Sequence, residues 1–471
     1  MARVTRIAII GGGPGGYEAA LVAAQLGADV TVVDRDGLGG SAVLTDVVPS
    51  KTLIATAEVM TDAAESGELG VRLGDEGSAA APNQVGVDMA RVNERVKALA
   101  KAQSDDIAAR MEREGVRVLP GLGRLDGTRR VVATSPDGSE QALDVDAVLV
   151  ATGAHPRVLP DAAPDGERIL TWEQVYDIDC LPEHLVVVGS GVTGAEFASA
   201  YTALGSQVTL VSSRDRVLPG EDADAATVLE GVFRRRGMTV LGRSRAQSVK
   251  RSGDGVVVTL ADGRTVEGSH CLMAVGSIPN TSGLGLEEAG VRLDDGGFIE
   301  VDRVSRTSTP GVYAAGDCTG VLMLASVAAM QGRIAMAHLL GDAVSPLNIR
   351  AVSSNVFTDP EIATVGWLEK DIEEGSTSTV TLKLPLATNA RAKMQGVHDG
   401  FVKLFARTGS GTVVGGVVVA PRASELIYPV ALAVDGRLTV DQLSHSFTVY
   451  PSISGSVAEA ARQLHTRVWQ A

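Results

Sequence analysis

Two short apolar runs, each followed directly by a glycine-rich turn, are the strongest pattern along the chain. One run covers residues 7–10 and the other covers residues 185–188, and glycines with the spacing Gly-x-Gly-x-x-Gly come next. A buried strand, a tight turn and a helix in this order are typical of a dinucleotide site. The glycines let the backbone approach a pyrophosphate, and the helix N-terminus donates N–H groups to it. The glycines are Gly11, Gly13, Gly16, Gly189, Gly191 and Gly194. Two such motifs predict two bound dinucleotides, with electrons passing from one to the other.

The segment after the first fingerprint predicts a helix over residues 14–26 and then a strand over residues 30–33 that ends at Asp34. An acid about 20 residues past the glycines is typical of sites that bond the adenosine ribose hydroxyls. The first fingerprint therefore suits a dinucleotide with a free 2′-hydroxyl, such as FAD or NAD.

The second fingerprint repeats this register without the acid. From Gly11 to Asp34 is 23 positions, and 23 positions from Gly189 lead to Ser212, which is followed by Ser213, Arg214 and Arg216. Hydroxyl and guanidinium groups accept a 2′-phosphate without repelling it. The pattern predicts an NADPH site that also tolerates NADH. The alternative is that both arginines belong to a solvated turn, since a missing acid alone does not demand NADP.

Hydrophobic periodicity outlines the remaining elements. Apolar residues recur at helical spacing over residues 88–114, which predicts a long amphipathic helix. After about residue 350, strand patterns such as residues 415–419 alternate with a helix over residues 424–434, which predicts a separate α+β domain. Other expected elements are a helix opened by Pro49, a surface loop over 62–85, short strands to about 145, strands over 147–150 and 271–275, and a return to the first domain over 312–317.

Length and composition narrow the function classes. The 471 residues allow roughly three domains of about 150 residues. A net charge of −15 argues against nucleic acid or an anionic membrane as a partner. No apolar run approaches the ~20 residues that span a bilayer, and a strand pattern begins within six residues of the N-terminus, so we expect a cytoplasmic protein without a signal peptide. The three cysteines, Cys180, Cys271 and Cys318, form no Cys-x-x-Cys pair, and no metal site is expected.

Six motifs together resemble the flavoprotein disulfide reductases, the group of dihydrolipoamide dehydrogenase, glutathione reductase and mercuric reductase. They are the two fingerprints, the second of them extended to Glu196, Pro49-Ser50-Lys51, Ala151-Thr152-Gly153, Ala314-Ala315-Gly316-Asp317, and residues 356–363. The resemblance covers nearly the full length. It implies FAD on the first fingerprint, a nicotinamide nucleotide on the second, and a homodimer formed through the C-terminal domain.

The implied fold class is α/β, with two Rossmann-like dinucleotide-binding domains and a C-terminal α+β dimerisation domain. We expect an FAD-binding domain over 1–155 and 283–347, an NAD(P)-binding domain over 156–282, and an interface domain over 348–471. Besides the residues named above, the expected cofactor-binding residues are Gly40, Ser41, Lys51, Thr152, Gly153, Gly276 and Asp317.

The chain departs from the family at its redox centre. The family pattern is Gly-Gly-Thr-Cys-x4-Cys-x-Pro-Ser-Lys, but Ala42 and Val47 stand at the two cysteine positions here. The family's C-terminal His-Pro and Glu, an acid–base pair for thiols, are replaced by Tyr450 before Pro451 and by Gly455. Thiolate chemistry requires sulfur, and proton transfer to thiols requires the imidazole. We therefore expect the disulfide half-reaction to be absent.

The hydride-transfer half is intact. Lys51 and Glu196 match a family pair beside flavin N5, where a cation stabilises reduced flavin, and Asp317 matches the residue that bonds the ribityl chain. The alternatives are an ion pair that only clamps two domains and an ordinary loop aspartate.

These features predict an FAD-dependent NAD(P)H:quinone oxidoreductase. Tyr450 of the partner subunit is expected to line the acceptor pocket, unless it only fills the space left by the histidine. A soluble pyridine nucleotide transhydrogenase uses the same intact half and is the alternative. A non-enzymatic, FAD-binding redox sensor is the second alternative.

Overall fold

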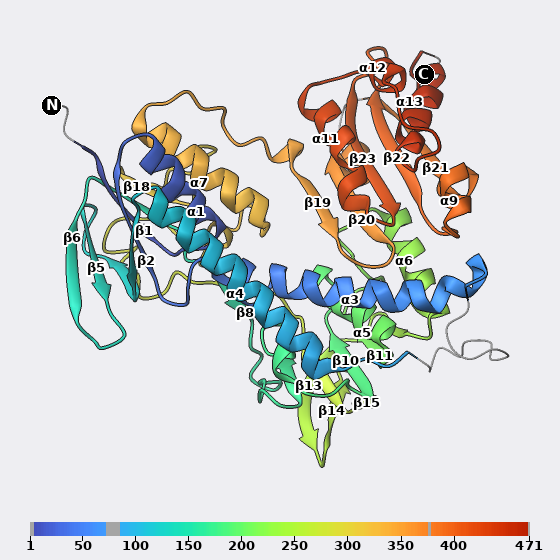
Figure 1. The fold of residues 1–471 in the computed structure, drawn as a ribbon, viewed down its shortest axis with the longest axis horizontal. Coiled ribbons are helices and arrows are strands. Elements are labelled where there is room, and N and C mark those ends of the chain that lie inside the picture. Colours follow the sequence, from blue (N-terminus) through green and yellow to red (C-terminus); the bar gives the residue numbers. More distant parts are fainter. Residues whose placement is uncertain (1–3, 72–84, 375–377, 470–471) are drawn as a thin grey trace. The chain divides into compact units, whose positions relative to one another are not determined.

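The computed structural model describes residues 4–71, 85–374 and 378–469 (Figure 1). Contacts divide the chain into two units. Unit 1 consists of Met1–Thr52, Asn93–Arg157 and Gly276–Asn348, and unit 2 of Leu53–Val92, Val158–Val275 and Ile349–Ala471. Each unit contains a five-stranded parallel sheet, and unit 2 also contains a five-stranded antiparallel sheet. This α/β arrangement agrees with the predicted fold class.

Unit 1 is built on a parallel sheet with the strand order β18-β7-β1-β2-β3. The helices α1 and α7 pack side by side (Figure 1), and they approach so closely that a Cβ atom on Gly332 would lie 2.1 Å from the carbonyl oxygen of Gly15. An antiparallel sheet, β4-β5-β6, and the short pair β8–β17 complete this unit. The elements are β1 (Arg6–Ile10), α1 (Pro14–Gln25), β2 (Asp29–Asp34), α2 (Gly40–Leu44), α3 (Val47–Glu65), α4 (Met89–Arg113), β3 (Arg117–Pro120), β4 (Leu122–Leu125), β5 (Arg130–Thr134), β6 (Glu140–Asp144), β7 (Ala147–Val150), β8 (Ala154–Pro156), β17 (Ser277–Pro279), β18 (Val312–Ala314) and α7 (Ala325–Leu340); α3 and α4 extend into unit 2.

The alternation of side chains along β1 explains how this sheet is covered on both faces. Ile7 and Ile9 are buried in a cluster with residues of α1 and α7, whereas Ala8 and Ile10 are buried in a second cluster with residues of β4, β5 and β6. Successive residues of a strand point to opposite faces, so a fully apolar run is what a sheet buried on both sides requires.

Unit 2 repeats this plan around the second fingerprint. Its parallel sheet has the order β12-β11-β10-β16-β9, and the antiparallel sheet β13-β14-β15 shares a core cluster with Val186 and Val188 of the central strand. The elements are β9 (Ile169–Thr171), β10 (His184–Val188), α5 (Val192–Leu204), β11 (Gln207–Val211), α6 (Ala223–Arg235), β12 (Thr239–Leu241), β13 (Ala246–Ser252), β14 (Gly255–Leu260), β15 (Thr265–Gly268) and β16 (His270–Met273).

The C-terminal part of unit 2 is an antiparallel sheet of order β19-β20-β23-β22-β21 with helices packed on it. Its central strand β23 is buried throughout, as its continuous apolar sequence predicts. The elements are β19 (Ser353–Val356), β20 (Glu361–Gly366), α8 (Glu369–Glu374), β21 (Thr379–Pro385), α9 (Ala390–Met394), β22 (Phe401–Arg407), β23 (Val413–Ala420), α10 (Ala423–Leu426), α11 (Tyr428–Asp435), α12 (Val440–His445) and α13 (Gly455–Val468).

Several sequence predictions need correction. The loop expected over 62–85 begins later, because α3 continues to Glu65 and a 3-10 helix covers Ser66–Leu69; residues 72–84 lie outside the described part. The helix with Pro49 begins at Val47 and follows the short helix α2. The single helix expected over 424–434 is two helices, α10 and α11, because Pro429 in the first turn of α11 has no N–H to continue the earlier helix. The three predicted domain boundaries stay a prediction.

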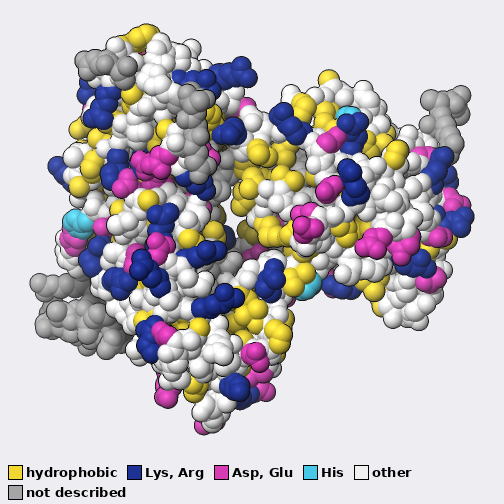
Figure 2. All heavy atoms as spheres, turned by 180° about the vertical axis from the view of Figure 1, so that it is seen from behind, with side chains coloured by type: hydrophobic (Ala, Val, Ile, Leu, Met, Phe, Trp, Pro, Cys, Tyr) yellow, Lys and Arg dark blue, Asp and Glu magenta, His cyan; other side chains and the backbone are white. Residues whose placement is uncertain are grey.

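Acidic and basic side chains are interspersed over the face drawn in Figure 2. Among the described residues, we find no helix that combines the length and the apolar character needed to cross a bilayer.

Candidate active site

The first fingerprint folds into an open cradle at the start of α1. A Cβ atom on Gly11 would lie 2.3 Å from the carbonyl oxygen of Ala151, and one on Gly16 would lie 1.9 Å from that of Gly11, so both positions require glycine for chain packing. By contrast, the described residues place just two heavy atoms within 4 Å of a Cβ atom on Gly13, the N-cap of α1: Gly40 Cα at 3.9 Å and the carbonyl oxygen of Gly39 at 4.0 Å. The free space and the N–H groups beyond Gly13 fit a pyrophosphate.

The second fingerprint has the same geometry at the start of α5. A Cβ atom on Gly189 would lie 2.0 Å from the carbonyl oxygen of Ala274, and one on Gly194 would lie 1.8 Å from that of Gly189. Around Gly191, the N-cap of α5, no heavy atom lies within 4 Å of the Cβ position among the described residues. Both fingerprints therefore fit the backbone of a dinucleotide.

Asp34 fastens the turns of the first cradle. One carboxylate oxygen, Oδ2, accepts the Gly12 N–H at 2.6 Å, and the other, Oδ1, accepts the N–H groups of Gly37 at 2.6 Å and Asp36 at 3.1 Å. A carboxylate has about four acceptor sites, so capacity for a ribose hydroxyl remains.

At the corresponding place in unit 2, Ser212 is turned inward. Its side chain is fully buried, and its Oγ lies 2.7 Å from Ser190 Oγ and accepts the Arg214 N–H at 3.1 Å. Ser213 and Arg214 are exposed, whereas Arg216 is half-buried and directs its guanidinium at carbonyl oxygens of its own loop. Of the set predicted to meet a 2′-phosphate, Ser213 and Arg214 are therefore accessible, and Ser212 braces the turn.

Lys51 and Glu196 lie on different units. Lys51 is half-buried in the part of α3 that belongs to unit 1. Glu196 is buried in α5 of unit 2, and its Oε1 accepts the Phe357 N–H at 2.9 Å. This bond joins α5, the helix of the second fingerprint, to the residue that follows β19. The sequence alone does not predict this contact.

The positions of the family cysteines carry no sulfur. Ala42 lies in α2 beside the exposed Ser41, and Val47 is the first residue of α3; both are half-buried.

The three cysteines lie elsewhere in the chain. Burial raises the pKa of the Cys318 thiol to about 11 and raises the pKa of the Cys271 thiol further. Both therefore stay protonated at neutral pH, as structural cysteines do, whereas Cys180 is exposed.

Asp317 lies on the turn after β18, and hydrogen bonds with Gln331 hold this turn in place. Gln331 of α7, which is buried, accepts the Gly316 N–H at 2.9 Å and donates to Thr319 Oγ1 at 3.3 Å. Burial raises the pKa of the Asp317 carboxyl to about 6. Sequence reasoning missed Gln331; its one signal is an amide on an otherwise apolar face of α7.

Asn280 fixes the Thr152-Gly153 turn. Its N–H donates to the Gly153 carbonyl at 2.9 Å, its Nδ2 to the Thr152 carbonyl at 2.9 Å, and its own carbonyl accepts the Thr152 hydroxyl at 2.6 Å. Sequence reasoning also missed this residue, which lies close to Gly276 in the chain. Gly153 and Gly276 both have positive φ, of 69° and 95°, which favours glycine there.

Tyr450 lies in the segment between α12 and α13 and is 86% exposed. Phe447 and Val449 in the same segment are also exposed. Within this chain, Tyr450 therefore fills no interior space.

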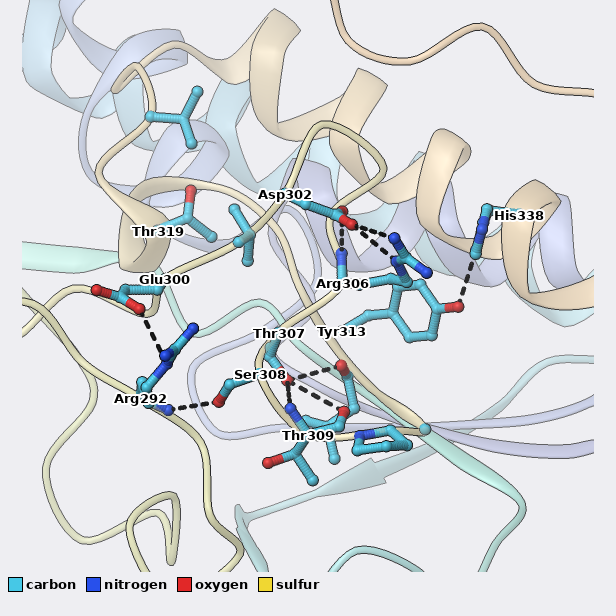
Figure 3. Close-up of a pocket in the computed structure, with 15 residues that line it drawn as sticks. Arg292, Glu300, Asp302, Arg306, Thr307, Ser308, Thr309, Tyr313, Thr319 and His338 are labelled. Atoms are coloured by element: carbon cyan, nitrogen blue, oxygen red, sulfur yellow. Dashed lines mark hydrogen bonds and ion pairs between the residues drawn. The ribbon is translucent and has the colours of Figure 1, made fainter.

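One hollow of unit 1 lies away from the fingerprints. This cavity of about 820 Å³ is lined in part by Tyr313, whose hydroxyl lies 2.9 Å from His338 Nδ1, and Figure 3 shows the lining side chains. Its charged side chains pair with each other, Arg306 with Asp302 at 2.7 Å and Arg292 with Glu300 at 3.2 Å. No residue predicted from sequence to bind a cofactor lines this cavity.

Similarity to known families identifies the class of protein to which the chain belongs. Residues 5–332 match the pyridine nucleotide-disulphide oxidoreductase family, and residues 352–461 match the dimerisation domain of that family. The protein belongs to this family of flavoprotein disulfide reductases. Its members are oxidoreductases, and the family implies FAD and NAD(P)H as cofactors and a homodimer.

The chain is 57% identical over 470 residues to a Mycobacterium tuberculosis protein named NAD(P)H dehydrogenase (quinone), covering 98% of this chain and 94% of that protein. It is 34% identical over 459 residues to a dihydrolipoyl dehydrogenase of Chlorobaculum tepidum, covering 97% and 96%. The crystal structure of LpdA from Mycobacterium tuberculosis superimposes with a TM-score of 0.92 at 56% identity, covering 98% of this chain and 100% of that one. The predicted family and fold class are confirmed.

Proposed function

We propose that the protein is an NAD(P)H:quinone oxidoreductase that prefers NADPH and uses no redox-active disulfide. The observation that carries this proposal is the combination of two dinucleotide cradles with Ala42 and Val47 at the cysteine positions. The name of the Mycobacterium tuberculosis relative, NAD(P)H dehydrogenase (quinone), supports a quinone as the acceptor.

Each of the two fingerprints would bind one dinucleotide. The N-terminus of α1 would hold the FAD pyrophosphate, with Asp34 at the ribose and Asp317 at the ribityl chain. The N-terminus of α5 would hold the nicotinamide nucleotide, with Ser213 and Arg214 at a 2′-phosphate. Arg214 suits this role because its guanidinium is exposed and forms no ion pair within the described ranges.

Bound FAD would supply a two-electron acceptor, so the net reaction is NADPH + H⁺ + quinone → NADP⁺ + hydroquinone. The Lys51 ammonium would stabilise the negative charge that develops on reduction. Glu196, fixed by the Phe357 N–H, would orient the nicotinamide ring.

The acceptor must take electrons without sulfur. Ala42 and Val47 present apolar side chains where the family has thiols, and a flat hydrophobic quinone suits such a surface. Tyr450 of the partner subunit would line the same pocket, because its aromatic ring is exposed in the single chain and the family dimerises through this domain.

An anaerobic titration with NADPH tests the proposal. We expect the flavin to take up two electrons per subunit with no thiolate–flavin charge-transfer band, turnover with menadione, and none with lipoamide or oxidised glutathione. Uptake of four electrons, or turnover of a disulfide, would refute it.

A soluble transhydrogenase is the second candidate, because its reaction also needs only two nucleotides and a flavin. Rates with menadione and with the thio analogue of NAD⁺ separate the two. Faster reduction of the analogue than of menadione would instead identify the enzyme as a transhydrogenase.

A further inference from the structure

A buried lysine in the C-terminal sheet is surrounded by carboxylates. Lys403 of β22 is 2% exposed, and its Nζ lies 2.9 Å from Asp222 Oδ2, 2.8 Å from Asp224 Oδ2 and 2.9 Å from Glu369 Oε2. A buried ammonium is costly unless it is paired and hydrogen-bonded, and three carboxylates satisfy it fully. Asp222 and Asp224 lie at the start of α6 and Glu369 opens α8, so the first two acids join the C-terminal sheet to the nucleotide-binding part of unit 2.

Asp222 is the structural centre of this cluster. Its side chain is fully buried and forms the N-cap of α6, where Oδ1 accepts the N–H groups of Asp224 at 3.0 Å and Ala225 at 3.2 Å. The other oxygen, Oδ2, bonds Lys403. Lys403 therefore fixes the rotamer with which Asp222 begins the helix.

The same helix start ends the loop that carries the proposed phosphate-binding residues. This loop, residues 213–221, is here termed the nucleotide loop. Its middle is tied to the second fingerprint, because the Leu218 N–H donates to the Ser190 carbonyl at 2.8 Å. Leu218 is buried and has a φ of 50°, a strained conformation that needs support from both sides. Near its end, the Gly220 carbonyl accepts from Lys370 Nζ at 3.4 Å.

We propose that Lys403 is a positioning residue for the nicotinamide nucleotide: it holds Asp222, and through Asp222 it holds the nucleotide loop that presents Ser213 and Arg214. The proposal rests on the nucleotide assignment made under the proposed function. It gives the C-terminal sheet a part in nucleotide affinity without any contact with the nucleotide.

Lys383 provides a matched control. It lies opposite Lys403 on the neighbouring strand β21, and its Nζ lies 2.8 Å from Asp224 Oδ1. It is 45% exposed and forms an ion pair with Asp224, whereas Lys403 also pairs with the N-cap Asp222. Lys383→Met removes the same charge from the same cluster and leaves the bond between Lys403 and Asp222 in place.

The test uses the FAD-loaded dimer with the substitutions Lys403→Met and Lys383→Met. The Kd of NADP⁺ is measured by calorimetry, and KM and kcat for NADPH are measured with saturating menadione. For Lys403→Met we expect Kd and KM to rise about fivefold or more, the loss of affinity that a disturbed helix cap represents, with kcat and FAD content little changed. Lys383→Met should stay within about twofold, as exposed ion pairs contribute little.

A merely structural lysine gives a different result. Unchanged Kd and KM in Lys403→Met, whatever the change in Tm, would overturn the proposal. If that variant does not fold, Asp222→Asn takes its place, because asparagine is a good N-cap but bonds the ammonium more weakly. An unchanged Kd in Asp222→Asn overturns the proposal equally.

Arg214→Ala separates this proposal from the one it rests on. Loss of the preference for NADPH over NADH supports the phosphate assignment. An unchanged preference refutes that assignment alone, and the role of Lys403 is then decided by KM for NADH.

Discussion

A methyl group at either of two glycines, three residues apart, should affect two different properties of this protein, nucleotide affinity at one position and stability at the other. Gly191 and Gly194 belong to the same fingerprint, and alanine at each adds one Cβ. At Gly191 that atom meets no described heavy atom within 4 Å, and the backbone, with φ −73° and ψ −172°, suits any residue. At Gly194 it would lie 1.8 Å from the carbonyl oxygen of Gly189.

The magnitudes follow from these distances. For Gly191→Ala, the poorer N-cap and the smaller entropy of the unfolded chain offset each other, so the free energy of unfolding should change by less than about 1 kcal/mol. The methyl group would occupy space that a pyrophosphate needs. A steric cost of about 1–3 kcal/mol corresponds to a rise in NADPH Kd of about 5- to 150-fold. Gly194→Ala should instead lower Tm, because the first turn of α5 must move away from Gly189.

The assay pairs urea unfolding with NADPH binding for both variants, and FAD content serves as an internal control because the first fingerprint is untouched. The reasoning fails if Gly191→Ala binds NADPH like the parent protein, since the nucleotide backbone would then not approach this glycine. It fails equally if Gly194→Ala is as stable as Gly191→Ala.

Three further results are expected. The raised pKa of Asp317, from 3.8 to about 6, favours the neutral acid in the folded cofactor-free protein, so its contribution to stability is complete below pH 3.8 and is lost as pH rises through about 6. The Tm of the apoprotein should therefore fall over that interval, and Asp317→Asn should flatten the fall; an identical profile would contradict the burial effect. Iodoacetamide should label Cys180 alone and leave menadione reduction unchanged, because Cys271 and Cys318 are buried thiols, and mass spectrometry of the treated enzyme checks both points. Tyr450→Ala should raise KM for menadione and leave KM for NADPH unchanged; equal effects on both would remove Tyr450 from the acceptor pocket.

The sequence predicts those parts of the fold that depend on neighbouring residues. Both fingerprints combine an apolar run with glycines at fixed spacing, and the helix over 88–114 follows from periodicity; the structure has it as α4, Met89–Arg113. The break between α10 and α11 depends on one proline, a signal that a 3.6-residue period overlooks.

The supporting contacts could not be predicted, because they join residues far apart in the chain. Asn280 lies 128 positions from Thr152, and Lys403 lies 181 positions from Asp222. In the sequence Lys403 is a single charged residue within the otherwise apolar run 401–406, and only the fold brings Asp222, Asp224 and Glu369 around it. The burial of the Ser212 side chain could not be predicted either, because a serine at the end of a strand can face solvent or the interior.

In each unit, a hydrogen bond joins the second residue of the fingerprint to the residue at the end of the next strand, and this bond restricts how nucleotide preference can evolve. In unit 1, Asp34 bonds the N–H of Gly12, and a Cβ on Gly12 would lie 2.8 Å from Leu38 Cδ2 and 3.1 Å from the Asp34 carboxylate, so a side chain at this position would crowd the acid as well as Leu38. In unit 2 the equivalent places hold Ser190 and Ser212, whose hydroxyls bond each other. An acid introduced at Ser212 alone would meet an occupied, buried place. Under the proposed NADPH assignment, a change of preference to NADH would therefore need Ser190→Gly together with Ser212→Asp, because the Ser190 hydroxyl lies where the new carboxylate would be placed.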